Sequence, residues 1–332
     1  MTPIPTEIRR ALDQVRRDVR RHQLWRPGQR VLLACSGGRD SMAALALLDA
    51  LRPSLGHSLV VAHVDHGLQA NHSATAEIVR AEAERRGLPV VLRPVTVKHG
   101  AGLEARARTV RYRALEACRV ILQADCIATA HHADDQAETV LLRLARGAGM
   151  DAHAGVRRVR VDAIVRPLLA LTRGQLAAIA AHFQVPWLAD PSNDDLAMSR
   201  NHLRHVVLPA LERALPGATA GLARSAMLAA AQEGALAAWI DRALGDRLHI
   251  DAVAGAARVP VADLPEHPAA QAALLQLVCQ RLAIPAPSQR AVAQWLALGS
   301  RGTCDLHGLT ATGDGILWQF FAKDVARPAP AD

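Results

Sequence analysis

The sequence predicts an α/β protein, a doubly wound parallel sheet followed by a smaller, largely helical second domain. From residue 30 onward, short apolar runs alternate with longer amphipathic segments, an order typical of a parallel sheet with helices on both faces. Polar and glycine-containing motifs follow directly after these runs. Because ligands of such sheets bind beyond the carboxyl ends of the strands, we expect the motifs to share one site.

The predicted strands are short and partly β-branched, as buried parallel strands are, and they span residues 31–35, 59–64, 90–95 and 126–130. The predicted helices have helical length and apolar period, and they span residues 40–51, 73–86, 103–118 and 134–144. Residues 147–155 and 186–195 are predicted connections, and a helix resumes over 200–215.

Composition and pattern divide the chain into an amphipathic N-terminal helix (1–29), an α/β domain that carries the motifs below (30–216), an Ala-rich linker helix (217–245), a small C-terminal domain (246–325) and a frayed tail (326–332). Residues 1–216 contain 30 basic and 21 acidic side chains, whereas the remainder contains 9 and 10. The positive charge therefore belongs to the first two thirds, which makes nucleic acid a candidate partner. In the C-terminal domain, Gly313-Asp314-Gly315 indicates a hairpin.

Several protein classes are excluded. The 332 residues contain no uninterrupted apolar run of the length, about 18 residues, that a membrane span needs. The N-terminal arginines are interleaved with acids and lack the apolar core of a secretory signal. The five cysteines are odd in number and include no Cys-x-x-Cys pair, so we predict neither a disulfide framework nor a cysteine-based metal site, and we expect a cytoplasmic protein.

The most specific feature is the run Ser36-Gly37-Gly38-Arg39-Asp40-Ser41 between a predicted strand and a predicted helix. Its glycines let the backbone approach an anion, and the N–H groups of a helix start add positive potential. An acid in a phosphate loop would repel the ligand unless a divalent cation bridges them, so we interpret Asp40 as a Mg2+ ligand. The alternative is a Gly-Gly turn with Asp40 capping the helix. The flanking strand, helix and serines favour the phosphate site.

Two further motifs have both functional and purely structural interpretations. His63-Val64-Asp65-His66-Gly67-Leu68 ends a strand, and its polar side chains are candidates for metal ligands, bases or ribose contacts, or simply for half-buried residues of a turn. Along the helix at 103–112, Glu104, Arg108 and Arg111 share one face. That face is either a solvated, salt-bridged surface or, through Arg111, a contact for phosphate or carboxylate.

The fourth motif, Thr129-Ala130-His131-His132-Ala133-Asp134-Asp135-Gln136-Ala137-Glu138-Thr139, runs from a strand end into a helix. Asp135 and Glu138 lie three residues apart on one face, with His131 just before the helix, so a cation or an amine fits between them. The alternative is that acids stabilise the helix N-terminus, by roughly 0.3–1 kcal/mol each. That accounts for Asp134, but not for the two histidines.

The Ser-Gly-Gly-x-Asp-Ser run, with the predicted strand before it and the predicted helix after it, resembles the PP-loop motif of ATP pyrophosphatases. These enzymes split ATP into AMP and pyrophosphate while adenylating a substrate. The resemblance implies an adenine-nucleotide α-hydrolase-like fold. With the other motifs and the segments 166–169, 190–193 and 200–204, the pattern resembles the bacterial tRNA(Ile)-lysidine synthetases. That family adenylates the 2-oxygen of the wobble cytidine of an isoleucine tRNA with a CAU anticodon, then joins free L-lysine and releases AMP.

This resemblance implies a role for each matching residue. It implies that ATP and Mg2+ are held by Ser36, Gly37, Gly38, Arg39, Asp40, Ser41, His63 and Asp65. It implies that catalysis depends on Asp40, Arg111, His131, Asp135 and Glu138. It implies tRNA contacts at Arg106, Arg200 and Arg204. An amine nucleophile needs carboxylates that bind its cationic form and accept its proton, a role open to Asp135 or Glu138. The pattern departs from the family at Gln69, where an arginine is common, and in its short second domain.

Three alternatives remain open on the sequence alone. A PP-loop enzyme that thiolates tRNA bases needs paired thiols, which this chain lacks. A metal-dependent hydrolase would leave the glycine-rich run without a role. A non-catalytic RNA-binding protein would stack bases on aromatic side chains, but only 3% of the residues are aromatic and they are scattered. The Ala-rich helix would also suit a homodimer.

Overall fold

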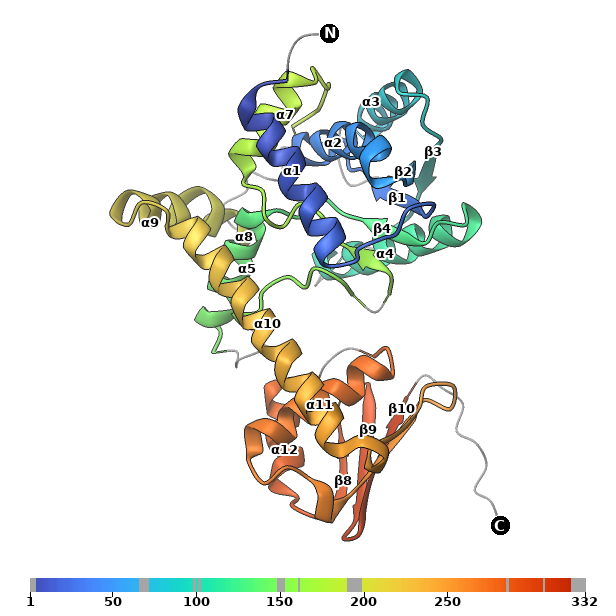
Figure 1. Ribbon diagram of the computed structural model, residues 1–332, viewed down its shortest axis with the longest axis vertical. Helices are drawn as coiled ribbons and strands as arrows, with labels where there is room; N and C mark the ends of the chain where they lie inside the picture. The colour runs from blue at the N-terminus through green and yellow to red at the C-terminus, as the bar shows by residue number, and fades with distance from the viewer. Residues whose placement is uncertain are drawn as a thin grey trace. The chain divides into compact units, whose positions relative to one another are not determined.

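The computed structural model describes residues 4–65, 72–97, 100, 103–147, 153–160, 162–189, 199–284, 287–306 and 308–323 (Figure 1). The chain forms two compact units. The first comprises Met1–Leu142 and Gly155–Ala226, and the second comprises Arg143–Ala154 and Met227–Asp332. Within the described ranges, no helix is both long and apolar enough to cross a membrane.

The first unit is built on a five-stranded parallel sheet of order β3-β2-β1-β4-β5. Its elements are α1 (Thr6–Arg21), β1 (Arg30–Ala34), α2 (Arg39–Leu55), β2 (Ser58–Asp65), α3 (His72–Arg85), β3 (Val90–Pro94), α4 (Leu103–Ile121), β4 (Cys126–Ala128), α5 (Ala133–Ala145), β5 (Ile164–Val165), α7 (Arg173–His182), α8 (Ser199–His202), a π-helical turn (Leu203–Val207) and α9 (Leu208–Ala214). The chain winds outward from β1 to β3, then crosses to β4 on the other side of β1. This order confirms the predicted doubly wound sheet.

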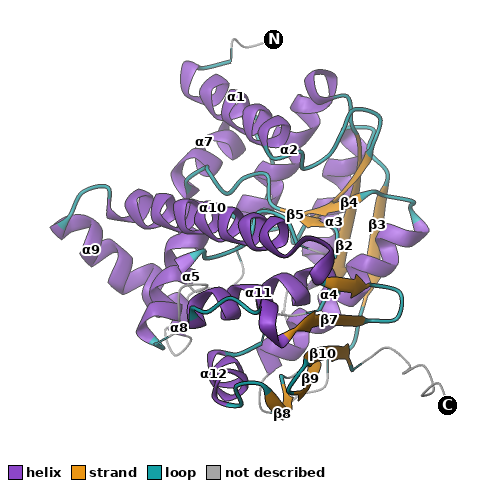
Figure 2. Ribbon diagram, turned by 60° about the horizontal axis from the view of Figure 1, so that its bottom comes forward, coloured by secondary structure: helices purple, strands orange, loops and turns teal. Residues whose placement is uncertain are grey.

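Alternate residues of each strand face opposite sides of the sheet, and each side has its own core. Leu33 and Val61 pack with α1, α2, α3 and α7 on one face. Leu32, Val60 and Ile127 pack with α4 on the other. Figure 2 shows helices on both sides of these strands. Because both faces are covered, β1, β2 and β4 are largely apolar and buried, which is why they were recognisable in the sequence, whereas the edge strand β3 is partly exposed.

The strand order places two loops side by side. β1 pairs with β2 on one side and with β4 on the other, so the loops after β1 and β4 leave the same edge of the sheet at its switch point. Cys35 N still donates to the carbonyl of Ala62 (2.9 Å), and Thr129 N to that of Val165 (3.0 Å). The phosphate-loop candidate and the His-His motif therefore begin next to each other.

The second unit contains more sheet than we expected. Its elements are α10 (Ala218–Leu244, which starts in the first unit), β6 (His249–Asp251), β7 (Ala256–Pro260), α11 (Pro268–Arg281), α12 (Gln289–Ala297), β8 (Arg301–Asp305), β9 (Leu309–Asp314) and β10 (Leu317–Ala322), with short 3-10 turns at Gly245–Arg247 and Val261–Asp263. The strands form an antiparallel sheet of order β6-β7-β10-β9-β8. This unit is therefore not largely helical; its short strands, only half buried, escape periodicity analysis.

The predicted hairpin at Gly313–Gly315 is present, because β9 and β10 pair in antiparallel register with Trp318 opposite Gly313. The Asp314 carboxylate closes the turn by accepting from the N–H groups of Ile316 (2.8 Å) and Leu317 (2.7 Å). Trp318 is fully buried in the core of this unit.

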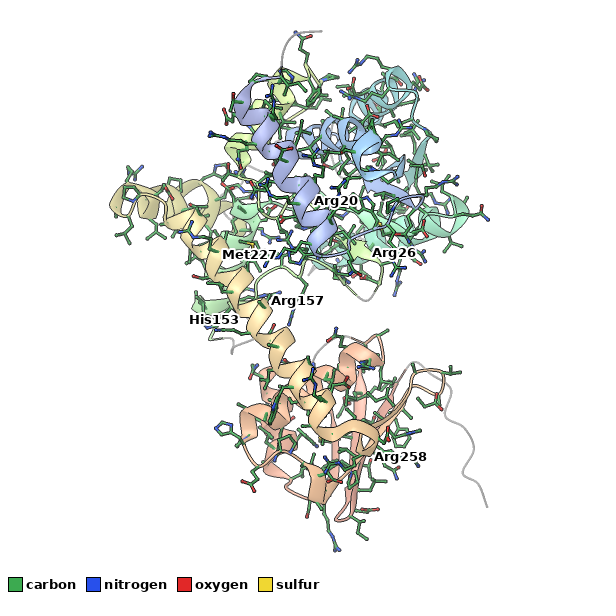
Figure 3. All side chains as sticks on the ribbon, in the orientation of Figure 1. Arg20, Arg26, His153, Arg157, Met227 and Arg258 are labelled. Atoms are coloured by element: carbon green, nitrogen blue, oxygen red, sulfur yellow. The ribbon has the colours of Figure 1, made fainter. Side chains whose placement is uncertain are left out.

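Arginine side chains such as Arg20 and Arg26 are exposed on the first unit (Figure 3). Both lie within the first two thirds of the chain, where the sequence concentrates its positive charge.

Candidate active site at the switch point of the sheet

The loop from Ser36 to Gly38 joins β1 to α2, and its two glycines have different reasons to be glycine. Gly37 has φ +83°, and a Cβ there would lie 2.2 Å from Thr75 Cγ2, so the fold itself excludes a side chain. Gly38 caps α2 with φ −76°, and a Cβ would meet only Ser36 Oγ at 3.7 Å. Nothing in the described part of the protein requires glycine at position 38. Glycine there would instead be required by an anion that approaches the backbone at the N-terminus of α2.

Two serine hydroxyls shape this loop. Ser41 Oγ accepts from the backbone N–H of Ser36 (3.1 Å), donates to the carbonyl of Gly38 (2.9 Å), and lies 3.1 Å from Ser36 Oγ. Ser41 is buried, whereas Ser36 is exposed. Ser41 therefore holds the loop in shape, and Ser36 is the hydroxyl that faces solvent.

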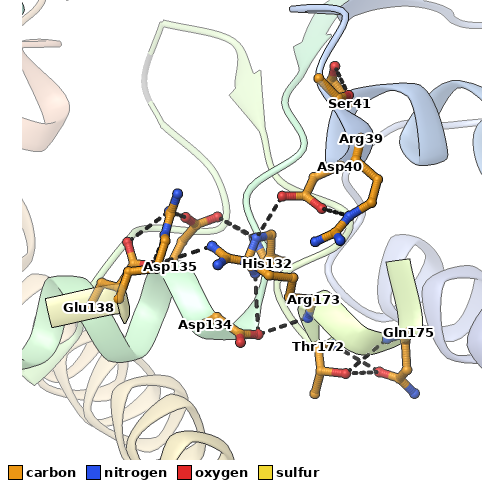
Figure 4. Close-up of polar contacts among 12 residues, drawn as sticks. Arg39, Asp40, Ser41, His132, Asp134, Asp135, Glu138, Thr172, Arg173 and Gln175 are labelled. Carbon is orange, nitrogen blue, oxygen red and sulfur yellow. Dashed lines mark hydrogen bonds and ion pairs between the residues drawn. The ribbon is translucent and has the colours of Figure 1, made fainter. Parts of the chain in front are cut away.

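His132 connects this loop to the loop after β4 (Figure 4). Its side chain is buried, with Nε2 3.4 Å from Asp40 Oδ2 and 3.5 Å from Asp135 Oδ2, and Nδ1 3.4 Å from Asp134 Oδ2. The Asp135 carboxylate also accepts from the backbone N–H of His132 (2.9 Å). One imidazole thus lies among three carboxylates, one from α2 and two from α5.

These contacts shift the pKa values of the cluster. Burial alone would lower the pKa of His132, but the charge of Asp135 and the contacts with Asp134 and Asp40 raise it to about 9. Burial opposes ionisation of Asp134, yet His132 and the backbone N–H of Arg173 (2.9 Å) lower its pKa to about 2. The pKa of Asp40 is likewise lowered, since His132 and Arg173 outweigh its burial. At neutral pH the cluster holds an imidazolium among carboxylates.

Glu138, one turn further along α5, is buried and faces three arginines. Arg204 donates to it from Nε (2.6 Å) and from a terminal guanidinium nitrogen (3.1 Å), and Arg200 and Arg173 lie 3.3 and 3.5 Å away. Arg204 also lies 3.4 Å from Asp135. Arg200 and Arg204 were predicted as tRNA contacts; the structure places both guanidinium groups against the carboxylate of Glu138, so their contact with RNA stays a prediction. Arg173 has no place in any motif and was missed.

The adjacent histidines differ. His131 Nδ1 lies 2.8 Å from the Thr129 hydroxyl. Burial lowers its pKa to about 3, and the charges of Arg166 and Arg108 act in the same direction. His131 is therefore neutral where His132 is cationic. Sequence reasoning chose His131, whereas the residue in contact with Asp40 is His132.

The remaining predicted site residues lie on α2, β2 and α4. His63 is buried, with Nδ1 2.9 Å from the carbonyl of Cys35, and it ties β2 to the start of the phosphate loop. Asp65 ends β2, and Arg39 Nε lies 3.4 Å from Asp40. Arg111 is half-buried beside the Tyr112 ring, while Arg106 donates to the carbonyl of Gly100 (2.7 Å). His66, Gly67, the side chain of Glu104 and residues 190–193 lie outside the described residues.

The donor set suits a magnesium ion that is shared with a phosphate ligand. Among the described residues, no group of three histidine, cysteine or acidic side chains is arranged to hold a metal alone. Asp40 offers a partly exposed carboxylate at the mouth of the phosphate loop. Magnesium in phosphate sites is commonly held by one or two carboxylates plus the phosphates. Asp40 therefore fits Mg2+ that arrives with a nucleotide.

Comparison with known proteins agrees with this geometry. The family model described as a PP-loop domain matches residues 5–211. The tRNA(Ile)-lysidine synthase of Thermobifida fusca is 44% identical over 65% of this chain and 67% of its own length. That of Azoarcus sp. is 37% identical over 81% and 60%, and that of Thermus thermophilus is 45% identical over 63% and 41%. The matched region thus spans between about two fifths and two thirds of these relatives.

Among solved structures, the U34-tRNA thiolase NcsA from Methanococcus maripaludis superposes with a TM-score of 0.57 at 18% identity, covering 66% of this chain and 77% of that one. At this identity the likeness concerns the fold. It agrees with the doubly wound sheet described above.

Proposed function

Because this chain belongs to the PP-loop family and, within it, to the tRNA(Ile)-lysidine synthases, we propose that it is an ATP-dependent tRNA ligase. In the first step, the 2-oxygen of the wobble cytidine attacks the α-phosphorus of ATP, and the bond to pyrophosphate breaks. In the second, the amine of free L-lysine attacks carbon 2, the bond to AMP breaks, and the amine loses a proton. The substrate is an isoleucine tRNA with a CAU anticodon.

The observation that carries this proposal is the position of His132 between Asp40 and Asp135. It joins the loop that would hold the triphosphate to the helix that would hold the amine, with contacts of 3.4 and 3.5 Å. Two consecutive transfers at one base need both reactants at the same place, and proximity of this kind supplies a large part of catalysis. The switch point of the sheet would bring the two reactants together in this way.

The phosphate loop would bind ATP through the exposed hydroxyl of Ser36, the open backbone at Gly38 and the N-terminus of α2. Asp40 would hold Mg2+, which when bound neutralises charge that develops on pyrophosphate. His132 would orient Asp40 towards this loop from the opposite side.

The carboxylates of α5 would bind lysine. Asp135 and Glu138 share one helical face and accept charge from Arg204, which lies within ion-pair distance of both. An entering ammonium group would share these oxygens with the arginines, and a carboxylate released from Arg204 would then accept the proton that the amine loses. The three arginines would in turn meet the negative charge of the α-carboxylate of lysine or of AMP. Such an enzyme works where tRNA and ATP are, in the cytoplasm.

The test is transfer of labelled lysine. Purified protein is incubated with radioactive lysine, ATP, Mg2+ and a transcript of an isoleucine tRNA with a CAU anticodon, and label in precipitated RNA is counted. We expect transfer by the wild type, loss in Asp40→Ala, and retention in Asp13→Ala, which removes a partly exposed acid on α1. RNA binding without ATP consumption would replace this proposal by the non-catalytic alternative. Light scattering of the same sample tests the homodimer.

Base thiolation has less support. Cys35, Cys118, Cys126 and Cys279 are buried and unpaired, and Cys304 is half-buried and unpaired. Burial raises the pKa of Cys35 to about 11, the wrong direction for a nucleophilic thiol. The thiolase in the comparison therefore shares the fold, while this chain has no paired-thiol site among its described residues.

A further inference from the structure

A cavity of about 450 Å³ lies on the α4 face of the first sheet, beside the edge strand β5. Arg108, Tyr112 and Arg113 of α4 form one wall, and Arg160 forms part of the other. Ile127 and Ile164, both buried, contribute apolar side chains. None of the residues assigned above to ATP, Mg2+ or lysine lines this cavity, so it has no role in the reaction as described.

The cavity is cationic because its acidic residues are already paired. Asp162 accepts from Arg160 (2.8 Å), and Glu116 accepts from both ends of the Arg119 guanidinium (2.7 and 2.8 Å). Over the described parts of the chain, Arg108 and Arg113 make no ion pair. Two uncompensated positive charges beside an apolar surface favour an anionic ligand.

Tyr112, the only tyrosine of the chain, holds these cations in place. The guanidinium carbons of Arg108 and Arg160 lie 5.0 and 5.1 Å from its ring centroid, which is cation–π distance, and Arg108 reaches the phenol oxygen at 3.4 Å. An arginine fixed against a ring loses less freedom when it binds a phosphate. Tyr112 therefore preorganises the cationic wall.

The combination of apolar side chains, an aromatic ring and arginines without acidic partners matches one ligand chemistry. Unstacked RNA bases lie against aromatic rings, guanidinium planes and apolar side chains, and their phosphates bind arginine. The cavity volume is within the range of sites that enclose a small ligand, about 300–1,000 Å³. A free carboxylate or inorganic phosphate would use only the charges of the arginines, whereas a nucleotide would also use their planar faces.

We propose that this cavity binds an unstacked nucleotide of the RNA substrate, with its phosphate on Arg108 and Arg113 and its base against the guanidinium plane of Arg160, which Tyr112 holds. The inference rests on the proposed function, because it takes the substrate to be tRNA. It adds a second point of attachment to the RNA besides the reacting cytidine. Arg108 also contributes to the lowered pKa of His131, which places the cavity within electrostatic reach of the active site.

Binding of the CAU transcript by Arg108→Gln, Arg113→Gln and the double variant tests this proposal directly. The matched control is Arg17→Gln, which removes the same charge from an exposed position of α1. We expect each cavity variant to weaken binding about tenfold, the usual effect of losing a charge-assisted hydrogen bond. In the double variant, the slope of log affinity against log salt should fall by about 0.7, because the neutralisation of one phosphate is lost. Tyr112→Ala should weaken binding more than Tyr112→Phe, which keeps the ring.

Three measurements make the outcome decisive. Thermal unfolding of each variant must match that of Arg17→Gln, so that a folding defect is recognised. If the double variant binds the transcript as tightly as Arg17→Gln while the wild type still transfers lysine, the cavity proposal is wrong and the proposed function stands. If affinity for ATP or inorganic phosphate falls in place of that for RNA, the cavity holds a free anion and the proposal is also wrong. A wild type that neither binds nor modifies the transcript overturns both.

Discussion

Two arginine-rich regions of the first unit differ in whether their arginines have acidic partners. At α5, Arg173, Arg200 and Arg204 surround the buried carboxylate of Glu138. At α4, Arg108 lies against the ring of Tyr112 without an acidic partner among the described residues. In the first region each arginine lies within ion-pair distance of an acid of the protein, and in the second Arg108, over the described part of the chain, does not. The comparison shows that arginine content alone does not tell which guanidinium groups already have an acidic partner and which do not.

The largest expected effect is at Glu138. Glu138→Gln would leave three arginines without their shared buried anion, and removing one partner of a buried ion pair costs about 3–5 kcal/mol. We expect urea unfolding to show a loss of this size. The matched change Glu77→Gln, at the exposed pair with Arg80, should hardly move the transition. Equal midpoints for the two variants would contradict the view that Glu138 holds the three arginines together.

The next effect concerns pH. The pKa of His132 is raised to about 9, so the stability that its charge contributes is complete below pH 6.5 and is lost as the pH rises through 9. A shift of this size corresponds to about 3 kcal/mol. We expect the wild type to lose that much more stability between pH 6.5 and 10 than His132→Gln does, measured by urea unfolding at each pH. Parallel curves would show that His132 is not held as a cation.

The two loop glycines should separate stability from ligand binding. Gly37→Ala forces a Cβ onto Thr75 at a positive φ and should destabilise the fold by roughly 1–3 kcal/mol. Gly38→Ala meets no such obstacle, so its melting temperature should stay near the wild-type value while its affinity for ATP falls. Unchanged ATP affinity in Gly38→Ala would remove the argument that this glycine serves a phosphate.

The smallest effect is expected at the start of α7. The Thr172 hydroxyl accepts from Gln175 N (3.2 Å) in a capping box, and Thr172→Ala should cost about 1 kcal/mol. Ser288→Ala removes an equivalent cap from α12 in the second unit. Only the first variant should also slow lysine transfer, since the next residue, Arg173, contacts Asp134 and Glu138. Equal transfer rates would show that α7 is only a support.

The sequence was sufficient to predict the strands and helices whose apolar pattern is long enough to read. The buried runs of β1, β2 and β4 and the helices α2 to α5 differ from the predicted ranges by a few residues at most. β5 has only two residues and therefore no period. α7 was missed, although Thr172 and Gln175 stand at the spacing of a capping box and would have indicated its start.

The site was only partly predictable, because motifs show residue types and not the partners that folding brings to them. The alternation of strands and helices was enough to expect Asp40 and Asp135 at one edge of a parallel sheet. Which of the two histidines lies between them depends on the direction in which the chain leaves β4, and that is not visible in the sequence. The arginines around Glu138 come from positions at least 35 residues further along the chain, so no local pattern announces them.

The wide turn at Leu203–Val207 has a consequence for tolerance to deletion. Each residue of a regular helix rotates the chain by about 100° around the helix axis. Deleting one residue here would therefore rotate Arg200 and Arg204 around that axis relative to α9. Val206 is exposed, and substituting it would cost little. Deleting Val206 would move the guanidinium groups of Arg200 and Arg204 away from Glu138. The length of this segment therefore matters more than its composition.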